Sequence, residues 1–146
     1  MIEIRTPLPA EKEQWLPLWQ GYNEFYEINI PSEITDLTWE RFHNPEESTR
    51  ILAAYESGVM VGFSAFLFHR STWAKNYYCY LEDLFVSKEF RKRGIAEQLI
   101  KAVVEAAKKN GASRVYWVTR EGNSTARPLY NKLAALTDYI QYRIDI

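Results

Sequence analysis

The stretch from residue 77 to residue 119 constrains the fold of this chain more than any other part of it. Residues 77–87, YYCYLEDLFVS, form a largely apolar run of strand-like character, and residues 95–110 place their polar side chains along one side at helical spacing before a glycine. Residues 113–119, SRVYWVT, predict another strand. A strand that leads through a helix into a second strand implies a parallel pair with a right-handed crossover. Part of the sheet is therefore predicted to be parallel.

Shorter patterns on both sides of this stretch predict the remaining elements. After Pro9, apolar and aromatic side chains recur at steps of three and four and predict a helix with an aromatic face, which Pro17 kinks unless it lies in the first turn. The other expected elements are strands at 2–5, 50–55, 59–69 and 139–146, of which the middle two form a hairpin and the last is half buried, and helices at 32–42 and 124–134, the latter capped near Ser124 or Thr125. We expect an α+β fold, a mixed sheet flanked by helices, in one domain that covers residues 1–146.

Composition excludes several classes of function. The chain has 146 residues and a formal net charge of -1, which argues against broad binding to nucleic acid or membranes. Its single cysteine, Cys79, allows no intrachain disulfide and is expected to be a small buried apolar residue. His43 and His69 stand alone, so no metal site is expected. The N-terminal residues lack the pattern of a signal peptide, and no apolar run is long enough to span a membrane, so we expect a cytoplasmic protein.

Two carboxylates, Glu82 and Asp83, are neighbours in the strand at 77–87. The alternation of strand side chains predicts two faces, with Tyr78, Tyr80, Glu82, Leu84 and Val86 on one and Cys79, Leu81, Asp83 and Phe85 on the other. The two carboxylates are therefore expected to serve different sites unless the strand is bulged there.

Four cations surround Gly94 at the joint between this strand and the helix at 95–110: Lys88, Arg91, Lys92 and Arg93. The first amides of a helix have no intrahelical acceptor, and the positive end of the helix dipole lies there, so the joint suits a compact anion such as a diphosphate. Because the cations are focused on one turn, a duplex nucleic acid fits less well. As a cluster of charge alone, the joint is equally typical of a solvated turn.

The residues around Gly94 resemble the acetyl-CoA-binding motif of the GNAT family of N-acetyltransferases. The segment RKRGIA has the form Arg-x-x-Gly-x-Ala, YLEDLFV precedes it as a strand, and EQLIKAVV follows it as a helix. The resemblance continues through VYWVTREGNSTARPLY, where an asparagine follows the strand and a tyrosine comes seven residues later. It implies the fold of that family and the transfer of an acetyl group from acetyl-CoA to a primary amine, by direct attack in a ternary complex.

The resemblance also implies roles for individual residues. The backbone amides of the loop and the helix start would bind the pyrophosphate of coenzyme A. The residues with this implied role are Arg91, Lys92, Arg93, Gly94, Ile95 and Ala96, the last of which stands where the family often has a glycine. Phe85 and Val86 would pair their backbones with the pantetheine arm. Asn123 would contact the same arm, and Tyr130 would lie beside the thioester sulfur.

Proton transfer sets the remaining requirements. An amine with a pKa of about 10.4 is neutral in only about one molecule in 2,500 at pH 7, so a base must take its proton. Glu82 is the best candidate, through a water molecule, and is equally well explained as a structural carboxylate. Tyr130 is the candidate acid. Because a phenol with a pKa of about 10 is a weak acid toward a thiolate of about 8.5, Tyr130 is expected to stabilise the thiolate by hydrogen bonding more than by full transfer.

The acceptor is less defined than the donor. YLEDLFV and the upstream Trp73 are similar to the polyamine and small-amine acetyltransferases of the family, but Ser71 stands where the polyamine enzymes have an aspartate. By this resemblance Asp83 and Trp73 would contact the substrate. Glu27 is one of several acidic residues in the first helices that either replace the missing aspartate or form a solvated face. The expected acceptor is a polyamine-like or amino-acid amine, or a protein lysine, and the alternative to catalysis is a non-catalytic acetyl-CoA sensor.

The strand expected at 139–146 would leave a free edge, because the family usually ends in two strands. Pairing with a second copy of the chain would cover that edge, so we expect a homodimer. Neither nucleic acid nor a membrane is expected as a partner.

Overall fold

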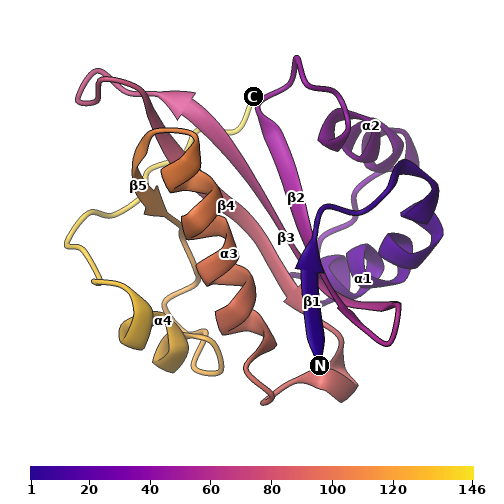
Figure 1. The fold of residues 1–146 in the computed structure, drawn as a ribbon. Helices are drawn as coiled ribbons and strands as arrows, with labels where there is room; N and C mark the ends of the chain where they lie inside the picture. Colours follow the sequence, from indigo (N-terminus) through magenta and orange to yellow (C-terminus); the bar gives the residue numbers. More distant parts are fainter.

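The computed structural model describes residues 1–146 and has a mixed sheet with the strand order β1-β2-β3-β4-β5 (Figure 1). The strands are β1 (Ile2–Arg5), β2 (Thr49–Glu56), β3 (Val59–Arg70), β4 (Tyr77–Val86) and β5 (Ala112–Tyr116). Neighbouring strands are antiparallel except β4 and β5, which are parallel and joined through helix α3 (Ile95–Lys109). The predicted α+β fold with a mixed sheet is confirmed.

Helices cover both faces of the sheet. α1 (Lys12–Phe25) and α2 (Ser32–Phe42) pack on one face, and α3 packs on the other (Figure 1). α4 (Arg127–Leu133) adds apolar side chains to the cluster under α3, and short 3-10 turns occur at Pro9–Glu11 and Lys88–Phe90. None of these helices is both long and apolar enough to cross a membrane.

The face under α1 and α2 is packed with aromatic rings. Trp15 is fully buried, and its ring stacks on those of Trp19 and Trp39 with centroids 5.1 Å apart in both cases. From the sheet, Phe63 meets the Trp15 ring at a steep angle with a centroid distance of 6.1 Å. The periodic aromatic pattern of α1 therefore forms the core on this face, and the helix continues through Pro17.

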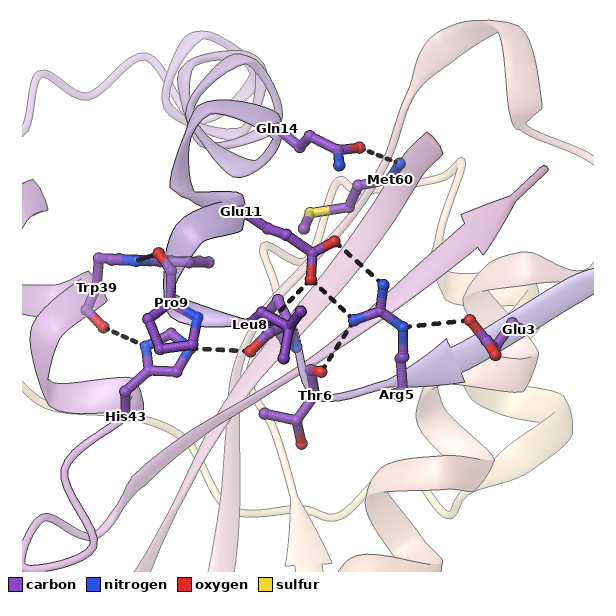
Figure 2. A network of polar contacts seen from close by, with 11 residues as sticks. Glu3, Arg5, Thr6, Leu8, Pro9, Glu11, Gln14, Trp39, His43 and Met60 are labelled. Carbon is purple, nitrogen blue, oxygen red and sulfur yellow. Dashed lines mark hydrogen bonds and ion pairs between the residues drawn. The ribbon is translucent and has the colours of Figure 1, made fainter. Parts of the chain in front are cut away.

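A polar network fixes where the chain leaves β1 and enters α1 (Figure 2). The Arg5 guanidinium donates to both carboxylate oxygens of Glu11, at 2.9 and 3.1 Å, and the amide of Leu8 donates to the same carboxylate at 2.7 Å. Hydrogen bonding by Arg5 lowers the pKa of Glu11 to about 2. In the first turns of α1, the side-chain oxygen of Gln14 accepts a hydrogen bond from the amide of Met60 at 2.9 Å. Polar contacts as well as rings thus hold the start of α1 on the sheet.

The other end of α1 approaches β4 closely. A Cβ atom on Gly21 would lie 2.7 Å from Cζ of Phe85, closer than Cβ atoms come to their neighbours, so a glycine is needed for this packing. The close approach brings the next residue, Tyr22, into contact with Asp83 of β4. The C-terminal end of α1 therefore forms one wall above the middle of β4.

β4 and β5 pair over only part of their length. The parallel register runs from Tyr77 opposite Ala112 to Tyr80 opposite Tyr116, where β5 ends, whereas β4 continues to Val86. The C-terminal half of β4 pairs with β3 alone. Its other edge is open, and an extended ligand could add to it as a further strand.

The helix cap expected at Ser124 or Thr125 is wrong. α4 begins at Arg127, because the Asn123 side chain accepts a hydrogen bond from the amide of Ala126 and holds the preceding residues in a turn. The expected position of the proline in the first turn of this helix is confirmed.

The strand expected at 139–146 is also absent. These residues have no regular secondary structure, and Ile140, Tyr142 and Ile144 are 76%, 89% and 90% exposed. Alternation specifies a strand only where a neighbouring edge supplies hydrogen bonds and a core covers the apolar side, and here neither is provided by the chain itself.

Candidate active site

The joint before α3 is built from unpaired amides. Lys92 and Gly94 have positive φ angles of 61° and 78°, which turn the chain sharply into the helix. The first hydrogen bond of α3 runs from the amide of Gln98 to the carbonyl of Gly94 at 3.1 Å, so the amides of residues 92–97 have no acceptor within the chain. Amides that converge at the positive end of a helix dipole suit a phosphate group.

The cations around this joint divide into two groups. Arg91 donates from Nε to the carbonyl of Val86 at 2.9 Å and lies over the ring of Phe85, and Arg93 forms an ion pair with Glu56 at 2.5 Å. Their side chains therefore brace the loop against β4 and β2. Lys88 and Lys92 form no ion pair and are exposed, so their charges are available to an incoming anion.

A β-bulge in β4 corrects the predicted strand faces. Opposite β3, Ala65 pairs with Asp83 and the next residue, Phe66, pairs with Leu81, so Glu82 is the extra residue. The hydroxyl of Ser64 donates to the backbone carbonyl of Asp83 at 2.9 Å and fixes the bulge from the buried side.

The bulge moves Asp83 to the face of the sheet that carries α1. Beyond it, Leu84 and Val86 pack under α3, whereas Asp83 and Phe85 face α1. Without the bulge these two pairs would exchange faces. Glu82 is exposed at the bulge itself.

Asp83 is a buried carboxylate beside tyrosines. It is 9% exposed, and burial raises its pKa to about 7, with the nearby charge of Glu82 adding to the rise. Contact with the hydroxyl of Tyr22 opposes this rise. In turn, burial and Asp83 raise the pKa of Tyr22, so its phenol keeps its proton and serves as a hydrogen-bond donor.

Residues from several elements surround the phenol of Tyr26, the residue that follows α1. Burial and Asp83 raise its pKa, and Arg120 and a hydrogen bond with Thr119 oppose that rise. Arg120 donates from Nη2 to the backbone carbonyl of Tyr26 at 3.2 Å. The loop after β5 thereby closes onto the end of α1.

Tyr130 completes the cluster from α4. Its ring meets that of Trp117 with centroids 5.4 Å apart, and burial, with a smaller contribution from Tyr26, raises its pKa to about 12. The hydroxyl therefore stays protonated over the whole neutral range. Side chains from α1, β4, the loop after β5 and α4 thus gather next to the open edge of β4.

The remaining residues singled out in the sequence lie at the border of this cluster or outside it. Asn123 donates to the hydroxyl of Thr119 at 3.0 Å and shapes the loop before α4. Trp73 is 70% exposed in the β3–β4 hairpin, and Glu27 is exposed just after α1. Of the three expected acceptor-binding residues, only Asp83 lies among the converging side chains.

Four residues of the cluster are absent from the sequence-based site: Tyr22, Tyr26, Thr119 and Arg120. The aromatic pattern of residues 15–26 contained a usable signal, because its last tyrosines, Tyr22 and Tyr26, carry hydroxyl groups where the earlier positions have the tryptophans of the core. No pattern in the sequence marks Thr119 or Arg120.

Replacing Asp83 with asparagine should remove a pH-dependent loss of stability. The raised pKa means that the folded chain holds a proton that the unfolded chain releases between about pH 4 and pH 7, so the parent's free energy of unfolding falls as the pH rises through that window. We expect Asp83→Asn to gain stability over the parent at pH 8 relative to pH 5 in urea unfolding. Glu82→Gln is the matched control, and identical pH behaviour of the two variants would contradict the buried, proton-holding state of Asp83.

Comparisons with known proteins identify the family. The model of the acetyltransferase (GNAT) family matches residues 15–135. The D-amino-acid N-acetyltransferase HPA3 of Saccharomyces cerevisiae is 33% identical over 97% of this chain and 89% of its own length. The thialysine N-epsilon-acetyltransferase of Caenorhabditis elegans is 28% identical over 95% of this chain and 83% of its own length. The structure of aminoglycoside N-acetyltransferase AAC(6')-Iy in complex with CoA shares the fold, with a TM-score of 0.85 at 21% identity over 99% of this chain and 95% of that one. The protein belongs to the GNAT family of acetyltransferases.

Proposed function

We propose that this protein transfers the acetyl group of acetyl-CoA to the primary amine of a small acceptor, by direct attack within a ternary complex. The observation that carries the proposal is the open edge of β4, which begins beside the converging side chains at Asp83 and ends at the joint with the unpaired amides of residues 92–97. A donor bound along this edge would present its thioester to Tyr130 and the buried carboxylate. The two relatives described above are named for amino-acid acceptors, which supports a small amine over a protein lysine.

Coenzyme A would bind through the backbone more than through side chains. The loop and helix start at residues 91–96 would hold the pyrophosphate, with Lys88 and Lys92 adding positive charge nearby. The pantetheine arm would add to the open edge of β4 at Phe85 and Val86, as an extra strand does. Asn123, which shapes the facing loop, would contact the arm from the other side.

Two carboxylates are available to take the proton from the amine. Asp83 faces the acceptor side, and a carboxyl group with a pKa of about 7 is well matched to accept a proton near neutral pH. Glu82 lies at the bulge, where it is exposed and would act through water. We propose that both groups serve one site, because the bulge makes them neighbours at the point where Asp83 turns toward α1, and that the acceptor amine binds between them with Asp83 nearest the buried end.

Tyr130 is proposed to stabilise the departing thiolate. Because its pKa is about 12, full proton transfer to a thiolate is less favourable than for an ordinary phenol, and the hydroxyl acts as a hydrogen-bond donor to the sulfur. The donated bond develops with the negative charge of the leaving group and therefore favours the transition state.

We also propose that the protein is cytoplasmic, that it forms a homodimer, and that it binds neither nucleic acid nor a metal. Ile140, Tyr142, Ile144 and Ile146 are exposed on an unpaired segment, and β5 has only β4 as a neighbour. A second copy would supply the edge and the apolar cover that this segment lacks.

Tyr130→Phe should lower kcat for acetyl transfer by about 10- to 100-fold, because a hydrogen bond to a charged group contributes about 1.5–3 kcal/mol. The affinity for coenzyme A should change little. The measurement is release of free thiol from acetyl-CoA with a panel of polyamines, amino acids and lysine peptides, together with calorimetry of CoA binding. Binding of coenzyme A without turnover of any amine would contradict the proposed activity and favour a non-catalytic sensor.

Ala96→Pro tests whether the unpaired amides of residues 92–97, the amide cradle, bind the ligand, and it does so without adding charge. Proline is tolerated in the first turn of a helix, as Pro128 of α4 illustrates, and it removes one amide donor. We expect the Kd for coenzyme A to rise by about 10- to 100-fold, the effect of one lost charge-assisted hydrogen bond. Ala96→Ser, which keeps the amide, is the control. Equal affinities of the two variants in calorimetry would show that this amide does not contact the ligand.

Deleting residues 139–146 should convert a dimer into a monomer, since it removes the segment that the second copy would cover. Size-exclusion chromatography with light scattering measures the mass directly. A monomer of 17.2 kDa for the undeleted chain would rule out the dimer.

A further inference from the structure

We infer that the acceptor carries a carboxylate in addition to its reactive amine, and that the guanidinium of Arg120 binds this carboxylate at the rim of the site. The inference rests on the proposed amine acetylation and names the class of acceptor. It makes an amino acid a better substrate than a plain amine or a polyamine.

Arg120 is held beside Tyr26, the residue that follows α1. Its Nη2 donates to the carbonyl of Tyr26 at 3.2 Å, and its guanidinium carbon lies 5.8 Å from the centroid of the Tyr26 ring. The Tyr26 phenol is also under the electrostatic influence of Asp83 and forms a hydrogen bond with Thr119. The cation beside Tyr26 and the buried carboxylate that influences its phenol come from different elements, and a small zwitterion bound next to this tyrosine would meet both charges.

The guanidinium of Arg120 has capacity to bind an anion. Arginine has five N–H donors, and the hydrogen bond from Nη2 to the carbonyl of Tyr26 uses one of them, so four remain for a ligand. Arg120 is exposed and forms no ion pair, in contrast to Arg5 and Arg93, which are paired with Glu11 and Glu56. A carboxylate could be bound by two parallel hydrogen bonds from its free side.

A polyamine is the competing acceptor, and the rim does not suit it. A second ammonium group would need carboxylates, and Asp36 is already paired with Lys12 at 2.7 Å. The acidic residues close to Tyr26 and Arg120 in the chain that form no ion pair are all exposed, so the rim carries charges of both signs: Glu24, Glu27 and Glu121. Opposite charges at the rim match the ammonium and carboxylate of an amino acid, whereas a polycation would be repelled by Arg120.

Matched acceptors that differ only in the carboxylate test this assignment. Lysine and cadaverine form one pair, and ornithine and putrescine form another. For the parent protein, kcat/KM should be higher for the amino acid of each pair. Arg120→Ala should lower kcat/KM for the amino acids by about 10- to 100-fold, mainly through KM, because the charge-assisted bonds to the carboxylate are lost. It should not lower kcat/KM for the diamines, from which the variant removes only a repelling charge.

Two further variants separate recognition from a structural effect. Arg120→Lys keeps the charge but not the two parallel donors, and should retain part of the preference. Arg114→Ala removes another exposed arginine that lies over a tyrosine ring, at 4.1 Å from Tyr78, and should leave both acceptors unchanged. Thermal unfolding of each variant confirms that the fold is intact.

The outcomes distinguish the inference from the proposed function. Equal kcat/KM values for the members of each pair in the parent, or an equal loss for amino acids and diamines in Arg120→Ala, would overturn the carboxylate assignment while acetyl transfer itself stands. Absence of transfer to every amine, with coenzyme A bound, would overturn the proposed function and this inference with it.

Discussion

One extra residue in β4 determines which side of the sheet carries Asp83. Strict alternation would direct its carboxylate into the apolar cluster under α3, where an ionised group has no partner. With Glu82 bulged out, the carboxylate instead contacts the hydroxyl of Tyr22, and Leu84 and Val86 return to the apolar side. The bulge therefore lets one strand supply apolar side chains to both faces and a buried carboxylate to one of them. Its hydrogen bond from Ser64 is buried, so the arrangement is held from within the sheet.

β4 also joins the two halves of the site. Its N-terminal half is paired on both edges, and its C-terminal half is released where β5 ends at Tyr116. The donor would use the released edge and the unpaired amides beyond it. The acceptor would use the face under α1, which can lie close to β4 because Gly21 has no side chain to meet Phe85. The two substrates would thus approach the same short piece of strand from its edge and its face.

The sequence was sufficient for the overall architecture but not for the local geometry of the site. Periodicity and turn residues predicted the crossover from β4 through α3 to β5, and the glycine at the start of α3 was predicted correctly as a helix boundary. A bulge has no comparable signature in the sequence. Leu81, Glu82 and Asp83 are compatible with a regularly alternating strand and with a bulged one, and only the register with β3 decides between the two. The contact of Arg120 with Tyr26 joins residues 94 positions apart, so local pattern could not predict it. The prediction of a strand at residues 139–146 failed for the opposite reason: the alternation of side chains is clear, but the chain provides no strand edge for this segment to pair with.

At the amide cradle before α3, the conformation of the main chain, more than the identity of the side chains, would determine ligand binding. Its donors belong to every amino acid except proline, so the identity of most side chains along it is free to drift during evolution. The constraint is concentrated at the two positions with left-handed backbone, Lys92 and Gly94, whose φ angles aim the neighbouring amides. Arg91 donates a hydrogen bond to the carbonyl of Val86, and Arg93 forms an ion pair with Glu56; both contacts stabilise that conformation. Related chains could therefore exchange surface charge around this loop and keep the backbone geometry that would bind a diphosphate.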